Sequence, residues 1–170
     1  GNSGGPLVNM TGEVVGINAF ITTNTGQFAG IGFAIPSTVF IDSYNQLVQG
    51  GEIRRGWLGV SMNTFPLTPE MAGFFGVAGN DPEGIKDGDG VLVTQLINET
   101  GEPSEIGPAA KAGIQPEDVI VKFGDKEVED LWDLRVVVAH TSPGKTVPVV
   151  VVRKGEVVHT DVELAQRTLE

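Results

Sequence analysis

The chain has 170 residues, of which 40% are hydrophobic and 24 are glycine, so it has room for two small globular parts rich in turns. Its formal net charge is −11, and acidic side chains concentrate in residues 80–130, where they repel phosphate backbones and anionic lipid. We therefore expect no nucleic-acid partner. The absence of cysteine excludes disulfides and thiolate metal sites.

The chain opens on a glycine-rich turn, Gly1-Asn2-Ser3-Gly4-Gly5, directly before an apolar segment. Glycines allow backbone angles that present a serine hydroxyl and let a substrate approach closely. The amides of Gly1 and Ser3 can then point at one carbonyl oxygen, as in an oxyanion hole. On its own, the motif fits a plain turn about equally well.

Short strands follow this turn. Short runs rich in apolar residues, separated by turn signals at Thr11-Gly12 and Thr25-Gly26, predict strands over Leu7–Met10, Val14–Ile21 and Ile31–Ile35. We expect these strands to belong to an antiparallel barrel.

This order of glycine-rich turn, strand, loop and strand resembles the end of the trypsin-like protease domain of the HtrA (Deg) family. The resemblance implies that Ser3 is the catalytic serine and that Gly1 and Ser3 supply the oxyanion amides. It also implies that one wall of the substrate pocket consists of Asn18, Ala19, Phe20 and Ile21.

A serine hydroxyl needs a base that takes its proton, and that base must be oriented by a third group. The two histidines of the chain, His140 and His159, lie far downstream of Ser3, whereas in chymotrypsin-like chains the histidine precedes the serine. We expect that neither serves Ser3. We therefore expect this chain to be the C-terminal part of a longer protease and to be inactive on its own.

The pattern changes after Pro36. Ser37 is a candidate cap for a helix over residues 38–49, and Gly50-Gly51 predicts the end of that helix. Residues 50–56 combine paired glycine with charge, which is typical of a linker. The predicted division is a C-terminal portion of a trypsin-like domain over 1–49, the linker over 50–56, and a second domain over 57–170.

The second domain resembles a PDZ domain of the HtrA type. The residues that carry this resemblance begin with Arg55-Gly56-Trp57-Leu58-Gly59-Val60. Gly107–Ile114 then predicts a short capped helix and a turn, and a buried strand follows Pro116. Asp130 is a candidate cap for a helix over Leu131–His140, followed by a turn at 142–145 and a strand over Val147–Arg153.

A PDZ domain implies a peptide-binding groove, in which amides of a tight turn hold a carboxylate and the ligand adds to a sheet edge. The implied peptide-binding residues are Trp57, Leu58, Gly59 and Val60 in the loop, and Leu131, Arg135 and Val138 on one stripe of the helix. Leu134 and Val137 form the neighbouring stripe, which we assign to sheet packing. A buried strand start and ordinary helix core remain open as alternatives for these residues.

Residues 65–107 form a long stretch rich in glycine, proline and acid. Leu67–Ala72 predicts a capped helix within it. Asn80–Gly90 carries several carboxylates without the spacing of a calcium-binding EF-hand, so we expect a mobile acidic loop and no metal site. Asn98–Ile106 is expected to be a loop of the same kind, and no cofactor is implied anywhere in the chain.

The expected fold is mostly β with short helices: the C-terminal part of a chymotrypsin-like β-barrel followed by a PDZ domain. The resemblance implies a serine endopeptidase that hydrolyses unfolded or misfolded proteins, binds hydrophobic C-terminal peptides at its PDZ groove and forms a homotrimer. It also implies an extracytoplasmic location, in a bacterial periplasm or cell envelope. Two alternatives remain: a peptide-binding module, and a pseudoprotease without catalysis.

Overall fold

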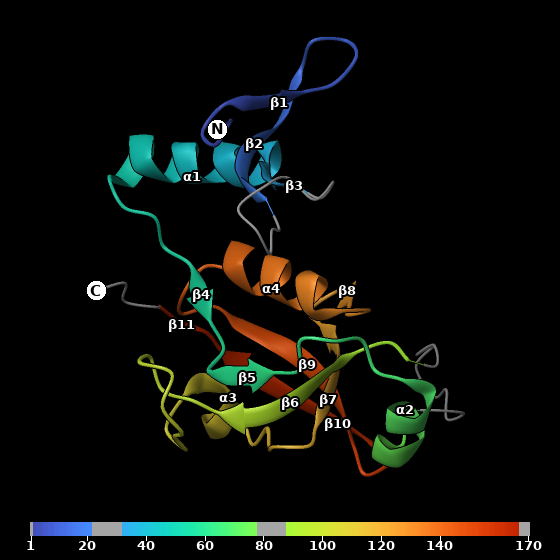
Figure 1. Ribbon diagram of the computed structural model, residues 1–170. Coiled ribbons are helices and arrows are strands. Elements are labelled where there is room, and N and C mark those ends of the chain that lie inside the picture. Colours follow the sequence, from blue (N-terminus) through green and yellow to red (C-terminus); the bar gives the residue numbers. More distant parts are fainter. Residues whose placement is uncertain (1, 22–31, 78–87, 167–170) are drawn as a thin grey trace. The chain divides into compact units, whose positions relative to one another are not determined.

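The computed structural model describes residues 2–21, 32–77 and 88–166 (Figure 1). The chain divides into two compact units, Gly1–Ile53 and Arg54–Glu170, and the boundary falls among the residues predicted as a linker. Among the described helices, none is both long and apolar enough to cross a membrane.

The described residues of unit 1 form one antiparallel sheet and one helix. The sheet order is β1-β2-β3, and its strands are β1 (Pro6–Val8), β2 (Val14–Ile21) and β3 (Gly32–Pro36). The predicted bounds of β2 are confirmed, whereas β1 ends two residues earlier than predicted because the chain turns from Asn9 onward. The turn predicted at Thr25-Gly26 lies outside the described residues.

Helix α1 (Ser37–Gly50) contacts β2 and β3 of unit 1. The predicted cap at Ser37 is wrong: Ser37 is the first helical residue, and the cap position is held by Pro36, which offers no side-chain hydrogen bond. Proline suits this position because its backbone (φ −57°, ψ 145°) carries the extended β3 straight into the first turn. The predicted end is confirmed, since Gly51 adopts a left-handed conformation and donates its amide to the Leu47 carbonyl.

Unit 2 is built on a larger sheet with the order β10-β9-β7-β6-β5, and β8 pairs with β7 beside this path (Figure 1). Its strands are β5 (Val60–Met62), β6 (Val91–Leu96), β7 (Val119–Phe123), β8 (Lys126–Glu127), β9 (Thr146–Arg153) and β10 (Glu156–Glu163). A separate pair joins β4 (Gly56–Trp57) to β11 (Ala165–Gln166). The helices are α2 (Pro69–Phe75), α3 (Pro108–Lys111) and α4 (Leu131–His140).

The valine-rich strand β9 separates two hydrophobic clusters. Successive side chains of a strand point to opposite faces of the sheet. Val149 and Val151 lie in the cluster shared with α3 and α4, whereas Val150 and Val152 lie in the cluster shared with α2. Unit 2 therefore buries apolar residues on both faces of its sheet.

The predicted caps of α2 and α4 are confirmed. The Thr68 hydroxyl accepts a hydrogen bond from the Met71 amide, and Asp130 accepts from the amides of Trp132 and Asp133. Such caps satisfy amides that have no partner inside the helix.

One five-residue turn occurs twice, as Asn9-Met10-Thr11-Gly12-Glu13 in unit 1 and Asn98-Glu99-Thr100-Gly101-Glu102 in unit 2. In each, the asparagine Oδ1 accepts from the threonine amide, the threonine hydroxyl and the glutamate amide at 2.7–3.1 Å. The glycine has φ of 84° in one turn and 86° in the other, a region that disfavours other residues. Residues 98–102 thus form a hydrogen-bonded turn, where the sequence suggested a mobile loop.

Candidate functional site

Ser3 lies in an exposed turn that is fastened to β2. The Gly4 amide donates to the Asn18 carbonyl at 2.8 Å, and the Asn18 amide donates to the Gly5 carbonyl at 2.9 Å. The Ser3 hydroxyl donates to the Ala19 carbonyl at 2.9 Å. The turn therefore holds the Ser3 hydroxyl at the surface beside β2, while Gly1 lies outside the described residues.

The predicted substrate wall lies on β2, next to this serine. Asn18 and Ala19 are half-buried, and the side-chain Nδ2 of Asn18 donates to the Pro6 carbonyl at 3.4 Å. Phe20 is exposed and stacks on Phe33 of β3, with 4.7 Å between ring centroids. Of Ile21 the structure describes only the backbone, as the last residue of β2.

The loop between β4 and β5 uses its carbonyl groups internally. The Leu58 carbonyl accepts from the Ala109 amide at 2.9 Å, and the Gly59 carbonyl accepts from the Ile97 amide at 3.0 Å. The hydrogen bonds of the described residues include neither the Leu58 amide nor the Gly59 amide as a donor. Two neighbouring amides in a tight turn are an arrangement that suits an anion.

The backbone angle and the close neighbours at position 59 explain why this residue is glycine. Its φ is 81°, and a Cβ there would lie 3.1 Å from the Ile97 carbonyl oxygen and 3.2 Å from Pro108 Cδ. The Cη2 atom of Trp57 would lie 3.3 Å from the same Cβ. The loop is therefore packed directly on the start of α3.

The loop side chains and the α4 stripe have mixed surroundings. Leu58 and Val60 are buried in the core cluster, and Leu131 and Val138 pack against it while half-buried. Arg135, the third residue of the stripe, is exposed and places its guanidinium 5.7 Å from the Trp132 ring centroid. Leu134, from the stripe assigned to sheet packing, is fully buried.

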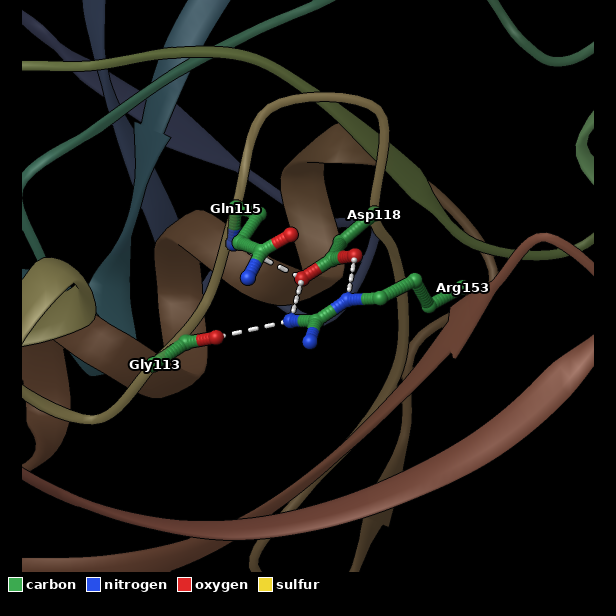
Figure 2. Close-up of polar contacts among 4 residues, drawn as sticks. All are labelled: Gly113, Gln115, Asp118 and Arg153. Atoms are coloured by element: carbon green, nitrogen blue, oxygen red, sulfur yellow. Dashed lines mark hydrogen bonds and ion pairs between the residues drawn. The ribbon is translucent and has the colours of Figure 1, made fainter.

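An ion pair fixes the turn that follows α3 (Figure 2). Asp118 is fully buried, and Arg153 of β9 binds both of its carboxylate oxygens at 2.7 Å. The same guanidinium donates to the Gly113 carbonyl at 2.7 Å, and Asp118 also accepts from the Gln115 amide at 2.8 Å. The hydrogen bond to Asp118 raises the pKa of Arg153 above its ordinary value.

Sequence reasoning missed three features of unit 2: the Asp118–Arg153 pair, the role of Asn63, and a pocket beside Phe65 and Trp132. The partners of the ion pair are 35 residues apart, so no local pattern reveals them. Asn63 bonds to Leu92 of β6, 29 residues away. Among the described residues, no three His, Asp or Glu side chains gather as a candidate metal site.

Comparison with known families agrees with the two units. The family model described as PDZ domain matches residues 57–164, and the model described as Trypsin matches residues 1–43. The expected fold class, mostly β with a trypsin-like part followed by a PDZ domain, is confirmed.

Curated relatives match almost the whole chain. A probable periplasmic serine endoprotease DegP-like of Hahella chejuensis is 42% identical over 166 residues, which are 98% of this chain and 32% of the relative. The protein of the same name from Chlamydia trachomatis is 38% identical over 98% of this chain and 30% of its own length. The chain thus spans about a third of these relatives, and their periplasmic naming supports an extracytoplasmic location.

Solved structures lead to the same family. The HtrA-type protease AlgW with tripeptide has a TM-score of 0.73 and 34% identity, covering 100% of this chain and 51% of that chain. The serine endoprotease from Yersinia pestis has a TM-score of 0.58 and 29% identity, covering 100% of this chain and 48% of that chain. The chain belongs to the HtrA family, with a trypsin-like part joined to a PDZ domain.

Proposed function

We propose that this chain supplies the nucleophile and a peptide-binding PDZ groove of a serine endopeptidase. One observation carries the proposal: Ser3 is exposed in a turn fastened to β2, with its hydroxyl beside the strand that forms the predicted substrate wall. The naming of the relatives as serine endoproteases supports it. In the proposed reaction, Ser3 gives its proton to a base and attacks a peptide carbonyl, and the amides of Gly1 and Ser3 stabilise the oxyanion. The C–N bond then breaks as the amine leaves with that proton, and water hydrolyses the acyl-enzyme.

The base that activates Ser3 is proposed to come from residues outside these 170. Both histidines of the chain belong to unit 2, and the His140 Nδ1 atom is 2.7 Å from the Val136 carbonyl of its own helix. A hydroxyl without a base stays protonated near pH 7 and reacts slowly. We therefore propose that the 170-residue chain is catalytically silent.

The test compares the 170-residue chain with a longer chain of the same protein that includes the sequence preceding Gly1. A fluorophosphonate probe measures serine labelling, and an unfolded protein serves as the cleavage substrate. Labelling and cleavage are expected only in the longer chain, lost with Ser3→Ala and retained with Ser142→Ala, a matched exposed serine. Labelling of Ser3 in the 170-residue chain contradicts the missing base, and silence of a folded longer chain favours the pseudoprotease.

The PDZ part is proposed to bind peptides that end in a hydrophobic residue with a free carboxylate. Among the described strands, β5 is the end of its sheet and pairs only with β6, so its other edge can accept an added strand. The Leu58 and Gly59 amides lie at the start of this edge, where the carboxylate would bind. The solved structures of the HtrA-type protease AlgW with a tripeptide and with a decapeptide support peptide binding in this family.

Fluorescence anisotropy with one peptide as free acid and as C-terminal amide tests the carboxylate site. We expect the free acid to bind at least tenfold more tightly, since an amide loses the charge-assisted hydrogen bonds. Gly59→Ala is expected to abolish this preference, whereas Gly101→Ala, with a similar φ but no atoms within 4 Å of its Cβ position, retains it. Equal affinity for acid and amide contradicts the assignment.

By the same family resemblance, the whole protein is proposed to form a homotrimer. Unit 1 leaves large apolar side chains exposed, Phe20 and Phe40 among them, which is the kind of surface that protein contacts cover. Light scattering on the longer chain measures its mass directly, and a monomeric mass contradicts the proposal.

A further inference from the structure

A pocket of about 130 Å³ lies in unit 2 beyond the end of β5. Three segments line it: residues 63–66 after β5, Gly90-Val91 at the start of β6, and residues 130–132 at the start of α4. The loop that carries the Leu58 and Gly59 amides precedes β5, so the pocket and this loop lie at opposite ends of the edge strand. The pocket is therefore a separate place from the proposed carboxylate site.

Two exposed aromatic side chains line this pocket. Phe65 is 80% exposed and Trp132 is 62% exposed, although both are large and apolar. The Arg135 guanidinium lies over the Trp132 ring and adds a cation–π contact. A ligand side chain placed here would cover apolar surface that now faces water.

The walls of the pocket are held by hydrogen bonds. Asn63 accepts from the Leu92 amide at 3.0 Å through its side chain, and its own amide donates to the Leu92 carbonyl at 3.1 Å. The Asn63 side chain also donates to the Phe65 carbonyl. On the opposite wall, Asp130 accepts from the Trp132 amide at 2.7 Å. A site fixed in this way loses little entropy when a ligand binds.

The strand geometry relates the pocket to a position in the peptide. A ligand that runs antiparallel to β5, with its last residue opposite Val60, places its third residue from the end opposite Met62; if the ligand stays extended, its fifth residue reaches the level of Thr64, beyond the end of the strand. These alternate residues share one face, and Thr64 lines the pocket. Since β5 ends at Met62, the fifth residue from the end has no strand edge to pair with and is held by its side chain.

We propose that this pocket is a second subsite of the groove, which takes an aromatic side chain at the fifth position from the C-terminus of the peptide. The inference rests on the proposed peptide-binding function. Aromatic rings gain from edge and offset contacts with Phe65 and Trp132, which an aliphatic side chain does not make. The Asp130 carboxylate lines the pocket and the Arg135 guanidinium lies over Trp132, so these opposite charges offset each other and an acidic residue gains nothing at that position.

The experiment uses the whole chain and labelled octapeptides that end in valine as the free acid and differ only at the fifth residue from the end. Anisotropy is expected to show the tryptophan peptide binding about five- to tenfold more tightly than the alanine peptide. A tryptophan moved to the fourth residue from the end points to the other face and should give no gain. A glutamate at the fifth position should bind no more tightly than alanine.

Substitutions in the protein locate the gain. Phe65→Ala and Trp132→Ala are each expected to reduce the tryptophan-to-alanine ratio to below about twofold, while the alanine peptide binds as before. Phe74→Ala removes an equally exposed aromatic residue, 81% exposed on α2 and away from the pocket, and should leave the ratio unchanged. A ratio unchanged by both pocket substitutions overturns the subsite.

The outcomes separate this inference from the function on which it rests. If the free acid binds better than the amide but tryptophan and alanine bind equally, the groove stands and the subsite is wrong. If acid and amide bind equally, the peptide-binding function itself fails and the subsite falls with it.

Discussion

The valines of β9 and the aromatic residues of α1 meet opposite environments. Val149 and Val151 are fully buried, whereas Phe40 and Tyr44 are 50% and 56% exposed. The difference follows from layering, because β9 has an apolar cluster on each face while α1 packs on one three-stranded sheet. Apolar content therefore does not by itself give burial, and the described part of unit 1 leaves large apolar side chains exposed.

The largest expected effect comes from replacing one phenylalanine in each unit and comparing how the two substitutions change the unfolding of unit 2. Phe123→Ala, at a side chain that is 1% exposed, is expected to lower the free energy of unfolding of unit 2 by about 3–5 kcal/mol. Phe40→Ala, in unit 1, is expected to change that of unit 2 by no more than about 0.5 kcal/mol. Urea unfolding followed by tryptophan fluorescence reports on unit 2, because both tryptophans, Trp57 and Trp132, lie there.

Equal effects of the two substitutions on that transition would show that the units unfold together. The two units would then differ in how deeply they bury apolar side chains, but they would not differ in stability.

A second test removes one partner of the buried ion pair. Arg153→Ala leaves the Asp118 carboxylate buried with the Gln115 amide, and is expected to lower the stability of unit 2 by about 2 kcal/mol. The value lies below that of a fully buried pair because the Arg153 side chain is 27% exposed. Arg153→Lys keeps the charge but loses the bidentate geometry, so its loss should be intermediate.

Lys126→Ala, at an exposed residue of β8, is the matched control and should have little effect in the same urea titration. A neutral outcome for Arg153→Ala would mean that water replaces the guanidinium without cost.

The predicted linker gives a third test. Trypsin is expected to cut first at Arg54 or Arg55, both exposed at the boundary between the units, and to release a unit 2 that resists further digestion. Mass spectrometry locates the cut, and replacing both arginines with glutamine should slow it. A first cut at Lys86 would show that the boundary is more protected than the acidic segment.

The smallest expected effect is a pH dependence within unit 1. Hydrogen bonds from Asn9 and then Thr11 lower the pKa of Glu13 below its ordinary value of 4.5. A lowered folded-state pKa stabilises the fold above pH 4.5, and that contribution is lost as the pH falls through the lowered value. A carboxyl NMR titration should give a midpoint below 4.5, and Asn9→Ala should return it toward 4.5; an unchanged midpoint would contradict the hydrogen-bond account.

Local chemistry explains what the sequence could predict. The caps of α2 and α4 depend on hydrogen bonds between residues two or three apart, and β2 follows from a continuous run of mainly apolar residues after the Thr11-Gly12 turn, so both were predicted correctly. The Ser37 cap failed because Pro36 carries the strand directly into the helix. The Asp118–Arg153 pair and the pocket at Trp132 depend on segments brought together by the sheet, which no local pattern encodes.

The repeated asparagine turn has a consequence for the order of folding. Each turn closes a five-residue loop through its own side chains, so its closure entropy is small and we expect it to form within microseconds. The pairing of Val60 with Leu96, by contrast, joins β5 to β6 across a long intervening segment. We therefore expect β5 to dock late, so that the edge proposed to receive a peptide becomes available only when folding of unit 2 is nearly complete.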